Sequence, residues 1–129
     1  MKRQERIYYA HSKLIYGTAR EKAELAFLRK KFSEDVYQVL DPNKDMGELG
    51  SMTPYLVAVS KCTEVICSEY KGFIGKGVYH EVHCALEKGI PVWCIKKFPI
   101  LGGLVMKKVS GVRVYDENDW KVRYARLVI

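Results

Sequence analysis

Strand-like and helix-like segments alternate along this chain, and this alternation constrains the fold more than any other feature of the sequence. Runs with high strand propensity predict strands at residues 6–10, 36–40, 63–68, 91–96 and 109–115. Helical patterns separate the first four runs. The sequence therefore predicts an α/β fold: a single-domain Rossmann-like or flavodoxin-like three-layer sandwich whose central, mainly parallel, five-stranded sheet carries helices on both faces.

Helix signals occur in three segments, at residues 19–32, 54–61 and 77–88. Thr18 and Glu21 have the spacing of a capping box at the start of the first segment. Thr53 followed by Pro54 indicates a helix start at the second, because threonine caps a helix and proline suits its first position. These signals predict a helix in each segment.

The remaining segments are less regular. We expect loops or exposed connections at residues 41–51, 70–76 and 99–108, where turn-forming residues cluster. For residues 116–129 we favour a helix that presents Trp120 and Tyr124. The same residues, with Val122, also alternate as a strand would.

Composition limits the classes to which the protein can belong. The 129 residues, 48% of them hydrophobic and 29% charged, suit one domain over residues 1–129. No run of about eighteen apolar residues occurs, so we expect a cytoplasmic protein with no membrane partner. The four cysteines lack the spacing of a zinc module and are expected to be reduced and mostly buried. A net charge of +7 favours anionic ligands, but no nucleic-acid-binding motif accompanies it.

Ligands of open parallel sheets bind at the carboxyl ends of the strands. This rule selects three candidate site loops, at residues 11–17, 41–52 and 68–77. In the last loop, Ser68, Tyr70 and Lys71 offer polar contacts. Gly75 and Gly77 allow the backbone to approach a ligand closely.

Glu81 is the candidate of most interest. Its predicted helix carries a buried stripe at i, i+4, i+7 and i+8, formed by Val78, Val82, Ala85 and Leu86. Glu81 lies beside this stripe and is predicted to lie in the first helical turn, where unpaired N–H groups favour a negative charge. We expect it to stay ionised at neutral pH. From composition alone, an ordinary first-turn acid is the simpler interpretation.

Residues 77–92, GVYHEVHCALEKGIPV, carry a more specific pattern. They resemble the signature of the nucleoside 2-deoxyribosyltransferase family, in which a glycine precedes the catalytic glutamate by four residues, as Gly77 precedes Glu81. In that family alanine, glycine, proline and valine follow the glutamate at four, eight, ten and eleven positions. The corresponding residues here are Ala85, Gly89, Pro91 and Val92.

The resemblance implies an enzyme that cleaves or transfers the N-glycosidic bond of a nucleoside or nucleotide. Glu81 would attack the anomeric carbon and form a glycosyl-enzyme ester, with Tyr8 and Asp41 as further catalytic residues. The residues expected to bind the substrate are Tyr9, His11, Ser68, Tyr70, Lys71, Gly75 and Gly77. We expect no cofactor and no bound metal ion, and the resemblance implies a homodimer or larger homo-oligomer.

The loop before Glu81 departs from that family, which has acidic residues there. Lys71 and Lys76 stand in this loop, and we hypothesise that it holds a phosphate. The missing acids also support an alternative, a non-catalytic module that senses a nucleotide or small anion on the same scaffold. A third interpretation is a basic, nucleic-acid-associated protein. His80 and His83 do not predict a metal site, because a zincin helix needs histidines four residues apart.

Overall fold

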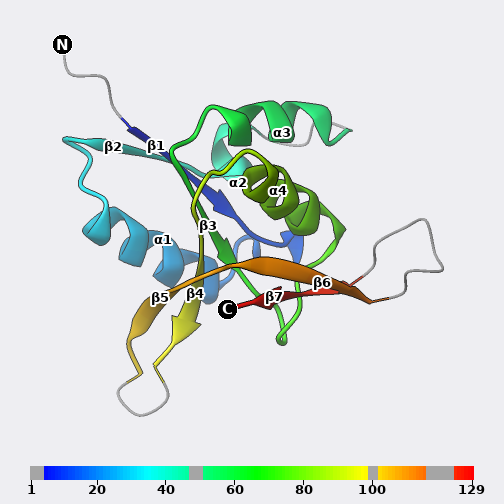
Figure 1. The fold of residues 1–129 in the computed structure, drawn as a ribbon. Coiled ribbons are helices and arrows are strands. Elements are labelled where there is room, and N and C mark those ends of the chain that lie inside the picture. Colours follow the sequence, from blue (N-terminus) through cyan, green and yellow to red (C-terminus); the bar gives the residue numbers. More distant parts are fainter. Residues whose placement is uncertain (1–4, 47–50, 99–101, 116–123) are drawn as a thin grey trace.

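The central sheet contains five strands in the order β2-β1-β3-β4-β5 (Figure 1). They are β1 (Glu5–Ala10), β2 (Tyr37–Leu40), β3 (Glu64–Ser68), β4 (Val92–Lys97) and β5 (Leu104–Lys108). The first four run parallel, and β5 lies antiparallel to β4. This confirms the predicted α/β fold with a mainly parallel five-stranded sheet. The computed structural model describes residues 5–46, 51–98, 102–115 and 124–129.

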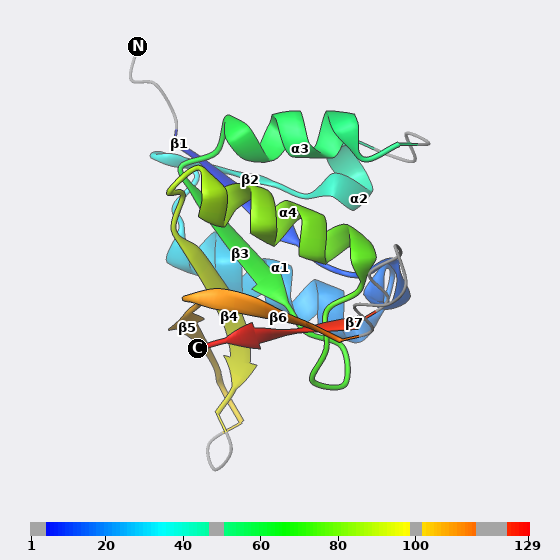
Figure 2. The ribbon, with the colours of Figure 1, turned by 45° about the vertical axis from the view of Figure 1, so that its right-hand side comes forward.

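Helices cover both faces of the sheet (Figures 1 and 2). On one face lies α1 (Ala19–Lys31), and on the other lie α3 (Thr53–Ser60) and α4 (Lys76–Glu87). The predicted cap of α1 is present, because the Thr18 side chain accepts a hydrogen bond from the Glu21 N–H. The three predicted helices are thus confirmed, but the predicted cap at Thr53 is wrong: Thr53 is the first residue of α3, and its cap, Met52, makes no side-chain hydrogen bond.

Two short helices follow the first two strands. η1 (Lys13–Ile15) comes after β1, and α2 (Pro42–Asp45) comes after β2. The prediction that residues 41–51 form only a loop is therefore wrong. The side chain of Asp41 caps α2 by accepting from the Asn43 N–H, and Pro42 occupies its first turn. This cap and proline start a helix that periodicity could not reveal in so short a segment.

Strand β1 is buried on both faces. Its residues Ile7, Tyr8, Tyr9 and Ala10 all have an exposed fraction of 0%. Successive side chains of a strand point to opposite faces, so Tyr8 and Ala10 pack with α3 and α4, whereas Ile7 and Tyr9 pack with α1. Both tyrosines therefore belong to the core.

The fifth strand of the sheet is not the predicted one. Residues 99–108 were expected to form an exposed connection, but they include β5. The predicted strand at residues 109–115 instead contributes β6 (Gly111–Tyr115), which lies outside the central sheet. Leu104 and Met106 pack on the α1 side, and β4 supplies the backbone partners of β5. These contacts come from distant residues and leave little local signal.

A second, two-stranded antiparallel sheet pairs β6 with β7 (Tyr124–Val128) beside α4 (Figure 2). A helix was favoured for residues 116–129, and this prediction is wrong for residues 124–128, which form β7. Residues 116–123, with Trp120, lie outside the described residues. Ala125 is buried and exchanges backbone hydrogen bonds of 2.9 and 3.0 Å with Ile74. Because of these long-range hydrogen bonds, residues 124–128 form a strand in spite of their local helical pattern.

Two expectations from composition can be compared with this fold. No helix within the described ranges is both long and apolar enough to cross a membrane. All four cysteines are free thiols, and Cys62, Cys67 and Cys94 are buried. The cysteines thus serve as small core residues, as expected.

The core interpretation predicts a large loss of stability for Leu28→Ala. Leu28 has an exposed fraction of 0%, and removing a buried leucine costs about 2–5 kcal/mol of unfolding free energy. Leu14, which is 68% exposed, provides the matched control: Leu14→Ala should change this free energy by less than about 0.5 kcal/mol. Urea denaturation followed by circular dichroism measures both, and equal effects would contradict the assigned core.

Candidate functional site

A cavity of about 600 Å³ lies where β1, η1, α2, α3 and α4 come together. Its wall is formed by His11, Ser12, Lys13, Tyr16, Pro42, Ser51, Met52, Tyr55, Gly75, Lys76, Gly77, Val78 and Glu81. In the observed strand order, β2 lies on one side of β1 and β3 lies on the other, so the topological switch point of the sheet is between β1 and β3. Ligands of such folds bind at the switch point. The cavity has the size and place of a small-molecule site.

Glu81 forms part of the cavity wall but does not lie in the first turn of its helix. α4 begins at Lys76, and its first turn holds no acidic residue. The first-turn prediction is therefore wrong. Glu81 is instead only 5% exposed and projects from the buried side of α4, with Val78, Val82 and Ala85.

The hydroxyl group of Tyr8 donates a hydrogen bond to the carboxylate of Glu81. This contact joins β1 to α4 across the core. Burial raises the pKa of Glu81 to about 7, although the bond from Tyr8 lowers it. Glu81 was expected to stay ionised at neutral pH, but with this raised pKa it is protonated more easily than an ordinary glutamate. Burial and the nearby Glu81 charge raise the pKa of Tyr8, which keeps its proton.

Several polar residues of the cavity were not among the predicted site residues. Ser12, Lys13 and Tyr16 belong to the segment after β1 that was selected as a site loop. The strand-end rule could therefore find the segment, but nothing in the sequence singled out these three residues within it. Burial raises the pKa of Tyr16, and the charge of Glu81 raises it further. Tyr55, near the start of α3, had no sequence signal.

The predicted substrate-binding residues divide into two groups. Gly75, Gly77 and His11 line the cavity. Ser68, Tyr70 and Lys71 do not: Ser68 is buried against α1, and Tyr70 pairs with Phe73 in a turn. Lys71 lies in that turn with its Nζ 5.4 Å from the centre of the Tyr70 ring.

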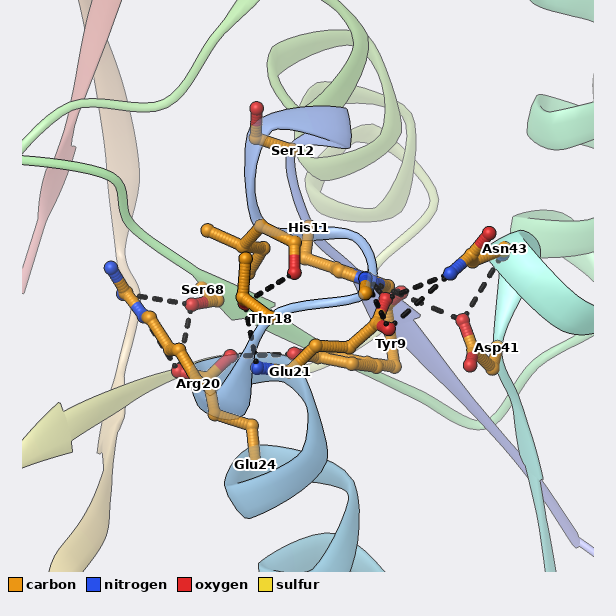
Figure 3. A network of polar contacts seen from close by, with 12 residues as sticks. Tyr9, His11, Ser12, Thr18, Arg20, Glu21, Glu24, Asp41, Asn43 and Ser68 are labelled. Atoms are coloured by element: carbon orange, nitrogen blue, oxygen red, sulfur yellow. Dashed lines mark hydrogen bonds and ion pairs between the residues drawn. The ribbon is translucent and has the colours of Figure 1, made fainter.

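Tyr9 lies on the opposite face of the sheet from Glu81 and joins a network of polar contacts (Figure 3). Its hydroxyl donates to Oε1 of Glu24 at 2.5 Å. Ser68 donates to the other oxygen of Glu24 at 2.9 Å, and Arg20 lies 3.3 Å from the same oxygen. This network satisfies the buried polar groups between β1, β3 and α1.

A second part of the network surrounds His11 (Figure 3). Its Nε2 lies 2.7 Å from Oε2 of Glu21 and 3.9 Å from Oδ1 of Asp41. Burial tends to raise the pKa of Glu21, but hydrogen bonds from Gly17, His11 and Asn43 outweigh it and hold that pKa below its ordinary value. Burial raises the pKa of Asp41. His11 thus connects the cavity to two buried carboxyl groups.

Comparison with known proteins shows no family to which the chain belongs: no family model and no curated protein matches it. What the structure establishes is the α/β fold and the geometry of this cavity.

The raised pKa of Glu81 predicts a pH-dependent cost to stability. Folding raises this pKa from 4.5 to about 7, so the contribution of Glu81 to stability is present below about pH 4.5 and is lost as the pH rises through 7. Glu81→Gln cannot ionise. As the pH rises from 4.5 to 8, its unfolding free energy should therefore increase by about 3 kcal/mol relative to that of the wild type. Urea denaturation at several pH values measures this difference.

The matched control is Glu87→Gln, on the same helix, whose side chain is 68% exposed. Its effect should stay within about 0.5 kcal/mol and should not vary in this way with pH. A Glu81→Gln effect that is the same at every pH would contradict the buried position of Glu81.

Proposed function

We propose that this protein cleaves or transfers the N-glycosidic bond of a nucleoside or nucleotide, with Glu81 as the nucleophile. The observation that carries the proposal is a nearly buried glutamate at the wall of the cavity, held by Tyr8. The resemblance of residues 77–92 to the nucleoside 2-deoxyribosyltransferase family supports it further, because the spacing of that family's signature falls on this same glutamate.

In the proposed reaction, a carboxylate oxygen of Glu81 bonds to the anomeric carbon of the sugar. The bond from that carbon to the base nitrogen breaks, and the base leaves with the electron pair and takes up a proton. Water, or a second base, then attacks the same carbon and displaces Glu81, which regains its charge as the attacking group loses a proton. This is the double displacement of retaining glycosidases.

Tyr8 is assigned a positioning role toward Glu81, because its hydroxyl already donates to that carboxylate. Tyr16, on the cavity wall, can hold a proton for the leaving base, whereas both ring nitrogens of His11 already face Tyr9 and Glu21. Asp41 is not part of the cavity wall and would act through His11, whose Nε2 lies 3.9 Å from it.

The rest of the cavity suits an anionic, aromatic ligand. Lys13 and Lys76 bring positive charge to its wall, and Tyr16 and Tyr55 offer rings against which a base can stack. Gly75 and Gly77 leave open space at the start of α4: a Cβ at Gly75 would meet nothing within 4 Å, and at Gly77 only Met52 at 4.0 Å. A nucleotide phosphate fits this end of the cavity.

A second candidate function is a non-catalytic sensor of a nucleotide or small anion. Among the described residues of the cavity wall, Glu81 is the one carboxylate, whereas retaining glycosidases generally use two. This observation favours binding without turnover. The two candidates share a ligand class and differ in whether the glycosidic bond breaks.

Base release distinguishes them. Incubated with ribonucleosides, deoxyribonucleosides and their 5′-monophosphates, the wild-type protein should release free base from at least one, detected by liquid chromatography. Glu81→Gln should lower this rate about 1,000-fold or more, because the nucleophile is lost. Mass spectrometry should find the glycosyl group on the peptide that contains Glu81.

Glu87→Gln should leave base release unchanged. The enzyme proposal fails if no substrate releases base or if Glu81→Gln is as active as wild type. The sensor is then supported if calorimetry shows monophosphate binding that weakens in Lys76→Ala. Lys71→Ala serves as the control, because Lys71 lies outside the cavity wall.

The proposal also predicts the pH profile. Because the nucleophile must be ionised and burial raises its pKa to about 7, kcat/KM should rise with pH through about 7. The Tyr8→Phe variant should move the midpoint to higher pH, since it loses a hydrogen bond that lowers the pKa of Glu81. Initial rates between pH 5 and 9 test this, and a wild-type midpoint near 4.5 would argue against Glu81.

A further inference from the structure

Three buried side chains from separate elements converge beside the cavity. His11 follows β1, Glu21 lies in the first turn of α1, and Asp41 follows β2. Their exposed fractions are 4%, 7% and 1%, respectively. Each offers one ligand atom, and these atoms all lie within 4.8 Å of one another.

Both ring nitrogens of His11 face oxygen atoms that accept hydrogen bonds. Its Nδ1 lies 3.1 Å from the carbonyl oxygen of Tyr9, and its Nε2 lies 2.7 Å from a carboxylate oxygen of Glu21. In the tautomer with its hydrogen on Nδ1, the Tyr9 contact is a hydrogen bond and the lone pair of Nε2 points at Glu21. A metal ion bound by Nε2 and by the Glu21 carboxylate suits this arrangement.

Asp41 provides a second and independent indication. Its Oδ2 is buried and has no hydrogen-bond partner among the described residues. An unpaired carboxylate oxygen in the interior is costly, and a cation is the group that most effectively compensates it. The position of Oδ2 is not explained by a proton on His11 alone.

The surroundings resemble the outer shell of a metal site. The carbonyl of Tyr9 holds Nδ1 of His11 and directs Nε2 toward the carboxylates. The Gly17 N–H donates to Oε1 of Glu21 at 3.0 Å, and the Asn43 N–H donates to Oδ1 of Asp41 at 3.0 Å. Each candidate ligand side chain is therefore oriented by a hydrogen bond from or to the backbone.

The spacing also suits an ion. Zinc lies about 2.0–2.2 Å from nitrogen and oxygen ligands, so neighbouring ligand atoms in a tetrahedral site are about 3.3 Å apart. Nε2 of His11 is 2.7 Å from Glu21 and 3.9 Å from Asp41, distances that fall on either side of this value.

We propose that His11, Glu21 and Asp41 bind a divalent transition-metal ion of the Zn²⁺ class. One imidazole with two carboxylates suits such an ion better than Mg²⁺ or Ca²⁺, which prefer oxygen ligands alone. Its two charges match those of Glu21 and Asp41, with His11 neutral. The ion would join the ends of β1 and β2 to the start of α1 and fix the part of the cavity wall formed by His11 and Pro42. The inference does not depend on the proposed glycosidic activity.

Metal titration of the full chain tests the site. After treatment with EDTA and dialysis, the protein should bind one Zn²⁺ per chain in isothermal titration calorimetry, and its Tm should rise with added ZnCl₂. Co²⁺ in place of Zn²⁺ should give a visible absorption band. His11→Gln and Asp41→Asn should each weaken Zn²⁺ binding at least about 100-fold. Loss of an outer-shell partner already weakens metal binding by up to about 100-fold, and loss of a direct ligand should cost at least as much.

His83→Gln is the matched control, because His83 also lies near a carboxylate, at 2.9 Å from Glu87, but on an exposed helix face. It should bind Zn²⁺ as wild type does. Circular dichroism verifies folding, and Glu21→Gln replaces any variant that does not fold. Zn²⁺ binding no tighter than millimolar, or binding that His11→Gln and Asp41→Asn leave unchanged, would overturn the proposal.

Discussion

The structure depends on the burial of the second part of β1, from Ile7 to Ala10. This part is paired on both edges and covered on both faces, yet Tyr8, Tyr9 and the residue after the strand, His11, have polar ends. A buried polar group is costly unless it is hydrogen-bonded, so each of the three needs a partner within the protein. Each is paired with a glutamate: Tyr8 with Glu81, Tyr9 with Glu24 and His11 with Glu21. The three pairs attach α1 and α4 to β1 and to the residue that follows it.

The carboxylates of Glu21 and Glu81 differ in pKa because different numbers of hydrogen-bond donors surround them. Glu21 receives hydrogen bonds from Gly17, His11 and Asn43, which hold its pKa below the ordinary value despite burial. The pKa of Glu81 is lowered only by the bond from Tyr8, and burial raises it to about 7. The same residue type is thus stabilised as an anion in one place and easily protonated in the other. The second kind of environment, at the wall of a cavity, is typical of functional carboxylates.

Much of the fold could be predicted because local patterns and long-range contacts agree for β1 to β4 and for α1, α3 and α4. The cap at Thr18 and the strand propensity of Ile7, Tyr8 and Tyr9 each indicate their element from neighbouring residues alone. The prediction missed the short α2 and failed after β4, where β5 and β7 depend on distant partners. The helical pattern near the C-terminus gave way to the pairing of Ala125 with Ile74, a bond between residues 51 positions apart.

For the candidate site, the sequence by itself determined that Glu81 falls in the helix before the fourth strand, with glycines preceding it, and it selected the loop after β1 as a candidate site loop. Only the tertiary structure decided what surrounds them. It paired Glu81 with Tyr8, which is 73 residues away, added Tyr16 and Tyr55 to the cavity wall, and left Ser68, Tyr70 and Lys71 outside it. The physical reason is that the environment of a side chain, and hence its pKa, is set by packing between elements distant in sequence, which no local pattern encodes.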